Sequence, residues 1–107
     1  MTDFLTVLTT TDAREKAEAL ARGAVAARLA ACAQVSAPIT SVYRWQGAVE
    51  ESTEWQVLFK TTTARYAELE AHLKAAHDYD EPEIIAMPVT HGSGGYLGWV
   101  AGETSAG

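Results

Sequence analysis

The chain has 107 residues, a formal net charge of -6 and a single cysteine. It has no cluster of lysine or arginine, which argues against nucleic acid as a partner, because phosphate binding needs a basic surface. No apolar run approaches the roughly 20 residues of a membrane span, and the first residues lack a secretory signal pattern. We therefore expect one cytoplasmic domain over residues 1–107, with no membrane partner.

The first two expected elements are a strand and a helix. Residues 4–9 are short, β-rich and apolar on both faces, which predicts a central strand. Asp12 and Glu15 have the spacing of a capping box at a helix start. Alanines recur at steps of three and four from there to Ala31, which predicts a helix that packs closely but buries little area.

A long β-hairpin over residues 39–61 organises the chain. A strand over residues 32–36 leads into it through a bend at Pro38, and Gln46-Gly47 supplies a residue that tolerates positive φ for a two-residue turn. In the second arm, apolar and polar residues alternate with a period of two, so one face should join the core. The other face is too apolar for free solvent and too charged for a dry core, which indicates a subunit interface or a binding cleft. That mixed face consists of Glu54, Gln56, Leu58 and Lys60.

A second helix is expected after the hairpin, with N-caps offered by the threonines at 61–63. An acidic loop at residues 77–82 follows it, ending in proline. The helix is predicted because four residues fall on one stripe at helical spacing. They are Tyr66, Leu69, Leu73 and Ala76.

The last part of the chain contains a strand and a short helix. Residues 83–89 predict a strand at a sheet edge or with a bulge, because Pro88 cannot donate to a ladder. The glycine-rich residues 92–95 predict a flexible connection to a helical turn or two at residues 96–100, and residues 103–107 are expected to fray. Two βαβ units around a hairpin predict an α+β ferredoxin-like sandwich, in which an antiparallel sheet carries two helices on one face.

Few side chains indicate chemistry. His77 stands among acidic residues and with Glu83 is a candidate ligand for a divalent cation. The alternative, which is more common, is a histidine at a helix end beside a solvated acidic loop. Cys32 is expected to be a buried, inert thiol, and one cysteine permits no internal disulfide. We interpret His72, in mid-helix, as structural or exposed.

The hairpin carries aromatic residues that have two interpretations. Tyr43, Trp45 and Trp55 form either a ligand platform or, as is usual for aromatics on strands, packing against neighbours and at an interface. Glu54 and Lys60 share a face, which predicts an interface ion pair or the polar part of a pocket.

Five stretches stand out in order along the chain: LAAC at 29–32, ITSVYRWQG at 39–47, KT at 60–61, HDYDEPEI at 77–84 and YLGWV at 96–100. Together they resemble the CutA divalent-cation-tolerance family, and the resemblance covers nearly the whole chain. It implies a ferredoxin-like homotrimer related to the PII signalling proteins, with hairpins that extend into the sheets of neighbouring subunits.

The resemblance also implies positions for metal ligands. Copper-binding members have a cysteine at the end of the first strand and a histidine pair before a Pro-Tyr in the loop. These positions hold Thr9, Ala76 and His77 here, and the proline is replaced by Asp78. His77 is the one ligand that this chain keeps, so we expect weaker copper binding than in those members.

Three functional hypotheses follow. The first is a trimeric, non-enzymatic protein of metal tolerance or metal binding, with copper or another divalent ion as its ligand and no certain cofactor. The second is a PII-like module that takes a small anionic or aromatic ligand in the cleft between subunits. The third, an enzyme using Lys60, Tyr79 and Glu83 as acid/base groups, ranks last because no nucleophile, base and orienting group form a set. The expected cleft residues are Tyr43, Trp45, Glu54, Lys60, Tyr79 and Glu83.

Overall fold

The computed structural model describes residues 3–105 of the chain. The strands and helices follow the order that the sequence predicts, and the bend at Pro38 separates the strand Cys32–Val35 from the hairpin as expected. No helix in this described range is long and apolar enough to cross a membrane. The elements are β1 (Phe4–Thr11), α1 (Arg14–Ala26), β2 (Cys32–Val35), β3 (Ile39–Trp45), β4 (Ala48–Thr62), a 3-10 turn (Thr63–Arg65), α2 (Tyr66–Ala76), β5 (Ile84–Pro88) and α3 (Gly94–Glu103).

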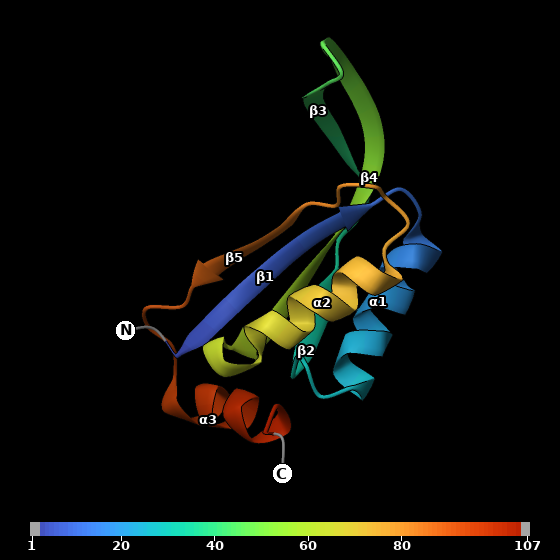
Figure 1. Ribbon diagram of the computed structural model, residues 1–107. Helices are drawn as coiled ribbons and strands as arrows, with labels where there is room; N and C mark the ends of the chain where they lie inside the picture. The colour runs from blue at the N-terminus through green and yellow to red at the C-terminus, as the bar shows by residue number, and fades with distance from the viewer. Residues whose placement is uncertain (1–2, 106–107) are drawn as a thin grey trace.

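The sheet is antiparallel, with strand order β2-β4-β1-β5 (Figure 1). β1 is central as predicted, and it pairs with β4 from Phe4 opposite Thr62. β2 pairs with the last part of β4, so that Cys32 lies opposite Lys60. Pro88 lies on the edge strand β5, where its missing N–H interrupts no inner ladder. The α+β ferredoxin-like prediction is confirmed.

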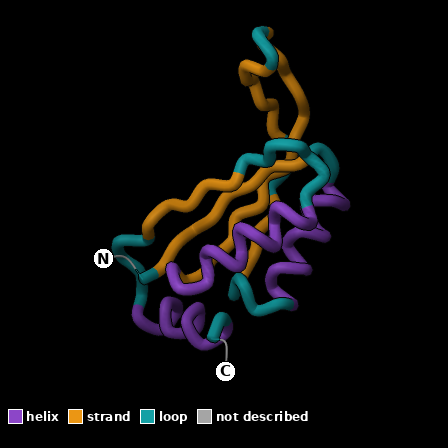
Figure 2. Tube along the Cα trace, in the orientation of Figure 1, coloured by secondary structure: helices purple, strands orange, loops and turns teal. Residues whose placement is uncertain are grey.

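The hydrophobic core lies between one face of the sheet and the helices α1 and α2, which run side by side across it (Figure 2). The two helices approach closely at Gly23, where an added Cβ would lie 3.3 Å from His72 Nε2. Of the two expectations for His72, structural or exposed, this close approach to α1 favours the structural one. The core is built mainly from Val7, Ala17, Leu20, Ala24, Val57, Phe59, Leu69 and Leu73.

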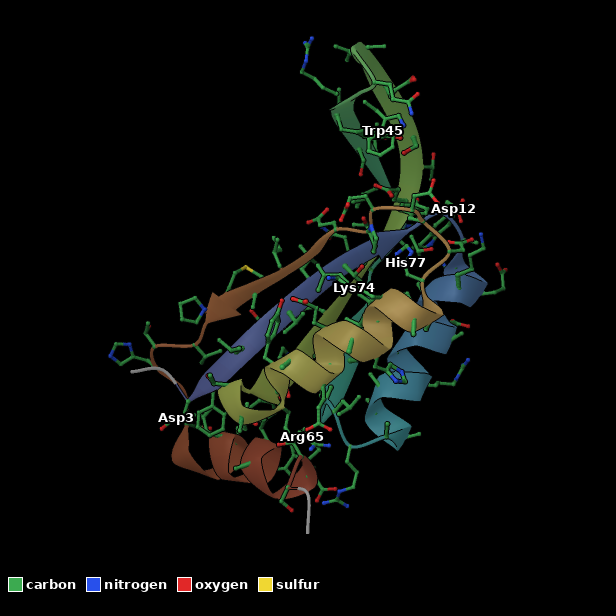
Figure 3. The ribbon with its side chains drawn as sticks, viewed as in Figure 1. Asp3, Asp12, Trp45, Arg65, Lys74 and His77 are labelled. Carbon is green, nitrogen blue, oxygen red and sulfur yellow. The ribbon has the colours of Figure 1, made fainter. Side chains whose placement is uncertain are left out.

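The hairpin of β3 and the first half of β4 projects beyond the body of the molecule, with Trp45 on the projecting part and His77 near its base (Figure 3). Its turn is the one predicted, since Gln46 has a φ of 50° and Gly47 a φ of 83°, the pair of positive values of a type I′ turn. Residues 42–51 are all exposed. The hairpin therefore has no core of its own within a single chain.

The second face of the sheet is not covered by α1 or α2. Leu8 lies on it, opposite both Leu58 on β4 and Ile85 on β5. Ile85 is 47% exposed and Met87 38% exposed, so this face presents a group of apolar side chains to solvent. We call the group of Leu8, Leu58, Ile85 and Met87 the open sheet face.

The predicted end of the first helix is wrong, because α1 stops at Ala26, well before Ala31. Arg28 takes a left-handed φ of 61°, and the N–H of Leu29 donates to the carbonyl of Ala24 at 3.0 Å, which is a Schellman motif. The Arg28 guanidinium then donates to two carbonyls at the end of α3, 3.0 and 3.3 Å away. These hydrogen bonds hold the backbone of Arg28 in a left-handed conformation that glycine normally occupies.

The helix starts also differ from prediction. The N-cap of α1 is Ala13, with no side-chain hydrogen bond, and Asp12 instead accepts from Lys16 at 2.8 Å. α2 begins after a 3-10 turn with Arg65 as its N-cap, again without a side-chain cap, so the threonines do not cap it. Of the predicted stripe on α2, Ala76 is exposed.

The glycine-rich segment is not the flexible connection that we predicted. Ser93 caps α3 by accepting from the N–H of Tyr96 at 3.4 Å, and the next two glycines form the first helical residues. α3 continues to Glu103, and Thr104 is buried, donating from Oγ1 to the carbonyl of Val100 at 2.8 Å. Of the residues expected to fray, 106 and 107 lie outside the described residues.

Candidate functional site

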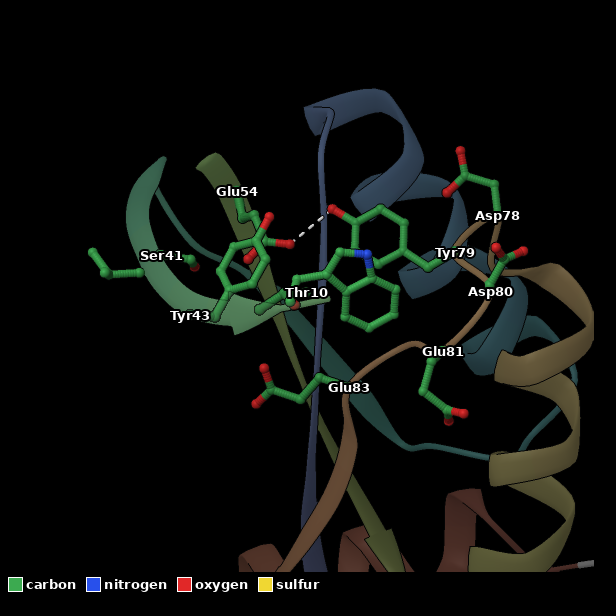
Figure 4. A pocket seen from close by; sticks show the side chains of 11 residues that line it. Thr10, Ser41, Tyr43, Glu54, Asp78, Tyr79, Asp80, Glu81 and Glu83 are labelled. Carbon is green, nitrogen blue, oxygen red and sulfur yellow. Dashed lines mark hydrogen bonds between the residues drawn. The ribbon is translucent and has the colours of Figure 1, made fainter. Parts of the chain in front are cut away.

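A cleft of about 600 Å³ lies where the hairpin meets the body of the molecule (Figure 4). We call it the hairpin cleft. The hairpin supplies one wall of the cleft, and the loop between α2 and β5 supplies the other. The hairpin wall is continuous with the body of the molecule, because β4 runs without interruption from the sheet into the hairpin (Figure 1). The cleft is lined by Thr10, Ser41, Val42, Tyr43, Trp45, Glu54, Asp78, Tyr79, Asp80, Glu81 and Glu83.

A hydrogen bond joins the two walls of the cleft. The hydroxyl of Tyr79 donates to Glu54 Oε2 at 2.7 Å, and Glu54 is only 7% exposed (Figure 4). Burial, followed by the hydrogen bond to the Glu54 carboxylate, raises the pKa of Tyr79 well above its ordinary value. Tyr79 is therefore a neutral hydrogen-bond donor at physiological pH, and it fixes the loop against the hairpin.

His77 is buried behind this contact, and both of its ring nitrogens have partners. Nε2 lies 2.7 Å from the carbonyl oxygen of Thr10, and Nδ1 accepts from the backbone N–H of Tyr79 at 3.1 Å. A carbonyl cannot donate, so Nε2 carries the proton and the ring has one fixed tautomer. To bind a metal ion, His77 would have to give up one of these two hydrogen bonds.

Lys16 holds the other side of the same loop. Its ammonium group donates to the carboxylates of Asp12 and Asp78, which joins the first turn of α1 to the loop. The Lys16 ammonium lowers the pKa of Asp78 below its usual range. The hydrogen bond to Asp12, followed by that to Asp78, raises the pKa of Lys16. The loop is thus attached to β1 through His77, to the hairpin through Tyr79 and to α1 through Asp78.

The structure brings five of the six predicted cleft residues together. Only Lys60 lies outside the hairpin cleft of its own chain, because it is six residues along β4 from Glu54, or about 20 Å. Its ammonium group donates to Gln34 Oε1 at 3.0 Å and lies 6.0 Å from the centre of the Tyr96 ring. The five residues in the cleft are Tyr43, Trp45, Glu54, Tyr79 and Glu83.

The positions that correspond to copper ligands do not form a cage within the described residues. Thr9 is fully buried, and its hydroxyl oxygen has no partner, whereas Ala76 is exposed. Over residues 3–105, no group of three or more histidine, cysteine, aspartate or glutamate side chains is close enough to hold a metal ion. Cys32 is half-buried rather than fully buried as expected. The pKa of the neighbouring Tyr96 is raised, first by the burial of the Tyr96 hydroxyl and then by the Cys32 thiol beside it.

Sequence reasoning missed two groups that shape the site. The carbonyl of Thr10 fixes His77, and Lys16 fixes Asp78. No sequence signal identifies a backbone carbonyl as a partner. For Lys16, the spacing of four residues from Asp12 on a helix was a usable signal, because such pairs meet on the helix surface.

Comparison with known proteins gives a consistent result. Residues 5–103 match the family model described as CutA1 divalent ion tolerance protein. A divalent-cation tolerance protein CutA from Thermus thermophilus is 43% identical over 98 residues, which cover 92% of this chain and 95% of that protein. The chloroplastic protein CutA of Arabidopsis thaliana is 39% identical over 100 residues, or 94% of this chain and 55% of that protein. A solved structure of the divalent cation tolerance protein Cut A1 from Thermus thermophilus superposes with a TM-score of 0.93 at 41% identity, covering 95% of this chain and 99% of that one.

Proposed function

The chain belongs to the CutA1 divalent ion tolerance family, as its motifs indicated, and on that premise we propose that it acts in divalent-cation tolerance as a non-enzymatic homotrimer. The observation that carries this proposal is the match over residues 5–103, which includes the sheet except Phe4 and all residues that line the hairpin cleft. We also propose a cytoplasmic location, which fractionation of cell extracts would test.

Two uncovered surfaces support self-association. A two-stranded hairpin in water is marginally stable, yet residues 42–51 project with no cover. The open sheet face exposes apolar side chains that a second copy of the chain would bury, with a gain of about 25 cal/mol per Å². Association would therefore supply burial that the single chain lacks.

Light scattering at micromolar concentration tests the assembly. We expect a mass three times the 11.5 kDa of the chain. Ile85→Lys should lower that mass, because it places a charge on the open sheet face, whereas Val25→Lys on the outer side of α1 should leave it unchanged. A monomeric wild type, or an equal effect of both variants, would contradict the assembly.

For the metal, we propose weak binding by carboxylates rather than a closed site. The ring of His77 is committed to two backbone groups, and carboxylates bind divalent ions with little discrimination. Calorimetric titration with Cu²⁺ should therefore give an affinity weaker than about micromolar, which His77→Ala changes no more than the control His91→Ala. Submicromolar binding lost only in His77→Ala would show that the loop rearranges around the metal.

The enzymatic alternative has little geometric support. Lys60 lies about 20 Å along β4 from the hairpin cleft, so within one chain it cannot act together with Tyr79 and Glu83. The second candidate, a PII-like binding module, is favoured by the size of the cleft and by the aromatic residues Tyr43 and Trp45 that line it. Of the anionic or aromatic ligand that we expected, the charge of the cleft argues against an anionic one, because its lining contains five carboxylates and no basic side chain.

A further inference from the structure

A smaller pocket, of about 230 Å³, lies at the end of the sheet remote from the hairpin, between the start of β1, the end of β4 and α3 (Figure 1). We call it the α3 pocket. Its lining includes Thr61 and Val100, which are 0% and 2% exposed, so the body of a single chain forms it. None of its lining residues belongs to residues 42–51 or to the open sheet face, the two surfaces that the proposed assembly covers. The pocket therefore does not depend on surfaces that association would bury.

The α3 pocket contains a half-buried lysine that lacks an acidic partner. The ammonium group of Lys60 donates to the neutral Gln34 Oε1 at 3.0 Å and lies 6.0 Å from the centre of the Tyr96 ring. Among the described residues, no carboxylate forms an ion pair with it. No aspartate or glutamate lines the pocket, although the chain has 14 of these residues. A negatively charged ligand would therefore meet attraction and no opposing carboxylate here, and partial burial would limit screening of that attraction by salt.

The size and the remaining lining of the α3 pocket limit the body of such a ligand. An apolar cavity of about 150 Å³ is large enough to hold benzene, so this pocket has room for one ring and a small polar group. It lies below the range of about 300–1,000 Å³ in which larger ligands bind. An apolar body is favoured because five of the lining side chains are aliphatic or aromatic hydrocarbons, namely Phe4, Leu5, Val89, Leu97 and Val100.

We propose that the α3 pocket binds a small monocarboxylate that carries one apolar ring, with the carboxylate on Lys60 and the ring among the apolar side chains of the pocket. The carboxylate accepts a charge-assisted hydrogen bond from the ammonium group, and the ring gains burial. No covalent step is involved. This site goes beyond the proposed role in divalent-cation tolerance and does not depend on it, because the α3 pocket and the hairpin cleft share no residue.

Titration of the assembled full-length protein with benzoate, followed by calorimetry and by amide NMR, tests the proposal. We expect one benzoate per chain with a dissociation constant below about 1 mM, and shifts in the amide signals of Gly92 and Leu97. Benzamide has the same shape without the charge, and acetate has the charge without the ring, so each should bind roughly tenfold more weakly or worse. Benzoate that fails to saturate the protein by about 10 mM, or benzamide that binds equally well, would overturn the proposal.

Matched variants locate the site. Lys60→Met keeps the apolar stem of the side chain and should weaken benzoate binding by about tenfold, whereas Lys74→Met, the same change at a lysine that pairs with Glu70 on α2, should not. Val89→Phe adds a ring to the lining of the pocket and should weaken binding as well. Light scattering and urea unfolding check that each variant keeps the wild-type mass and fold.

The outcomes separate this inference from the proposed function. Equal effects of the two lysine variants, or wild-type affinity in Val89→Phe, would place benzoate elsewhere and overturn the proposal. Absence of benzoate binding in a trimer that binds Cu²⁺ weakly would refute this inference alone. A monomeric wild type that binds benzoate would support the α3 pocket and contradict the proposed assembly.

Discussion

Replacing Tyr79 with phenylalanine should lower the free energy of unfolding by the contribution of one hydrogen bond, the one from the Tyr79 hydroxyl to Glu54. The change removes the hydroxyl that donates to Glu54 at 2.7 Å but keeps the ring, whose centre lies 4.7 Å from that of His77. Glu54 is buried, so water cannot replace the lost donor freely. Hydrogen bonds to charged groups stabilise by about 1.5–3 kcal/mol, and we expect the free energy of unfolding to fall by that amount.

Urea unfolding at equal protein concentration measures the effect, since association adds a concentration dependence. Tyr66→Phe is a matched control, because its hydroxyl donates at 2.8 Å to Glu70, whose side chain is 37% exposed. That loss should stay below about 1 kcal/mol. Glu54→Gln retains an acceptor for Tyr79, so it should cost less than Tyr79→Phe, and the double variant should be less destabilised than the sum of the two.

The pH dependence follows from the raised pKa of Tyr79. Below about pH 10 the phenol is protonated in both the folded and unfolded states, so its contribution to stability is complete. Above that pH the unfolded state ionises first, and the contribution is lost as the pH rises toward the folded-state pKa. The deficit of Tyr79→Phe should therefore shrink in alkali. A deficit below about 0.5 kcal/mol at neutral pH, or one equal to that of Tyr66→Phe, would refute the reasoning.

Three further predictions concern other contacts. Lys16→Met should lower the urea midpoint at neutral pH, and the difference from wild type should disappear as the pH falls below about 4, because the lowered pKa of Asp78 contributes only while that group is ionised. Gly23→Ala should gain its full helix propensity of about 1 kcal/mol only when His72 is also alanine, as a double-mutant cycle would show, because the added Cβ would lie 3.3 Å from His72 Nε2. Arg28→Gly should relieve left-handed strain of about 1 kcal/mol yet speed amide hydrogen exchange in α3, whose last carbonyls lose their donors.

Local chemistry carried most of the fold prediction. The turn at Gln46-Gly47 and the alternation along β4 depend only on residues that are adjacent in sequence, so both could be predicted from the local sequence. The end of α1 has a distant cause, since Arg28 holds its left-handed conformation with the help of carbonyls 74 and 77 residues away. The Asp12 cap failed because Lys16 competes for the same carboxylate.

The cleft was predicted in composition but not in position. Alternation showed that Glu54 and Lys60 share a face, yet side chains on one face of a strand can lie about 20 Å apart. Lys60 therefore contacts Gln34 rather than the cleft. The burial of His77 behind Tyr79 required a loop conformation that depends on three separate elements, and periodicity contains no information about such a loop.

The central position of β1 has a consequence for how the chain acquires its structure. β1 is made first, but its partners are distant in sequence, with Phe4 opposite Thr62 on one side and Leu5 opposite Pro88 on the other. Closing such long loops costs entropy before any pairing is gained, which slows folding. During synthesis, β1 must wait for β5 to leave the ribosome before both of its edges are satisfied. An unpaired apolar strand at that stage is an aggregation hazard, so nascent chains of this protein should depend on chaperones more than their small size suggests.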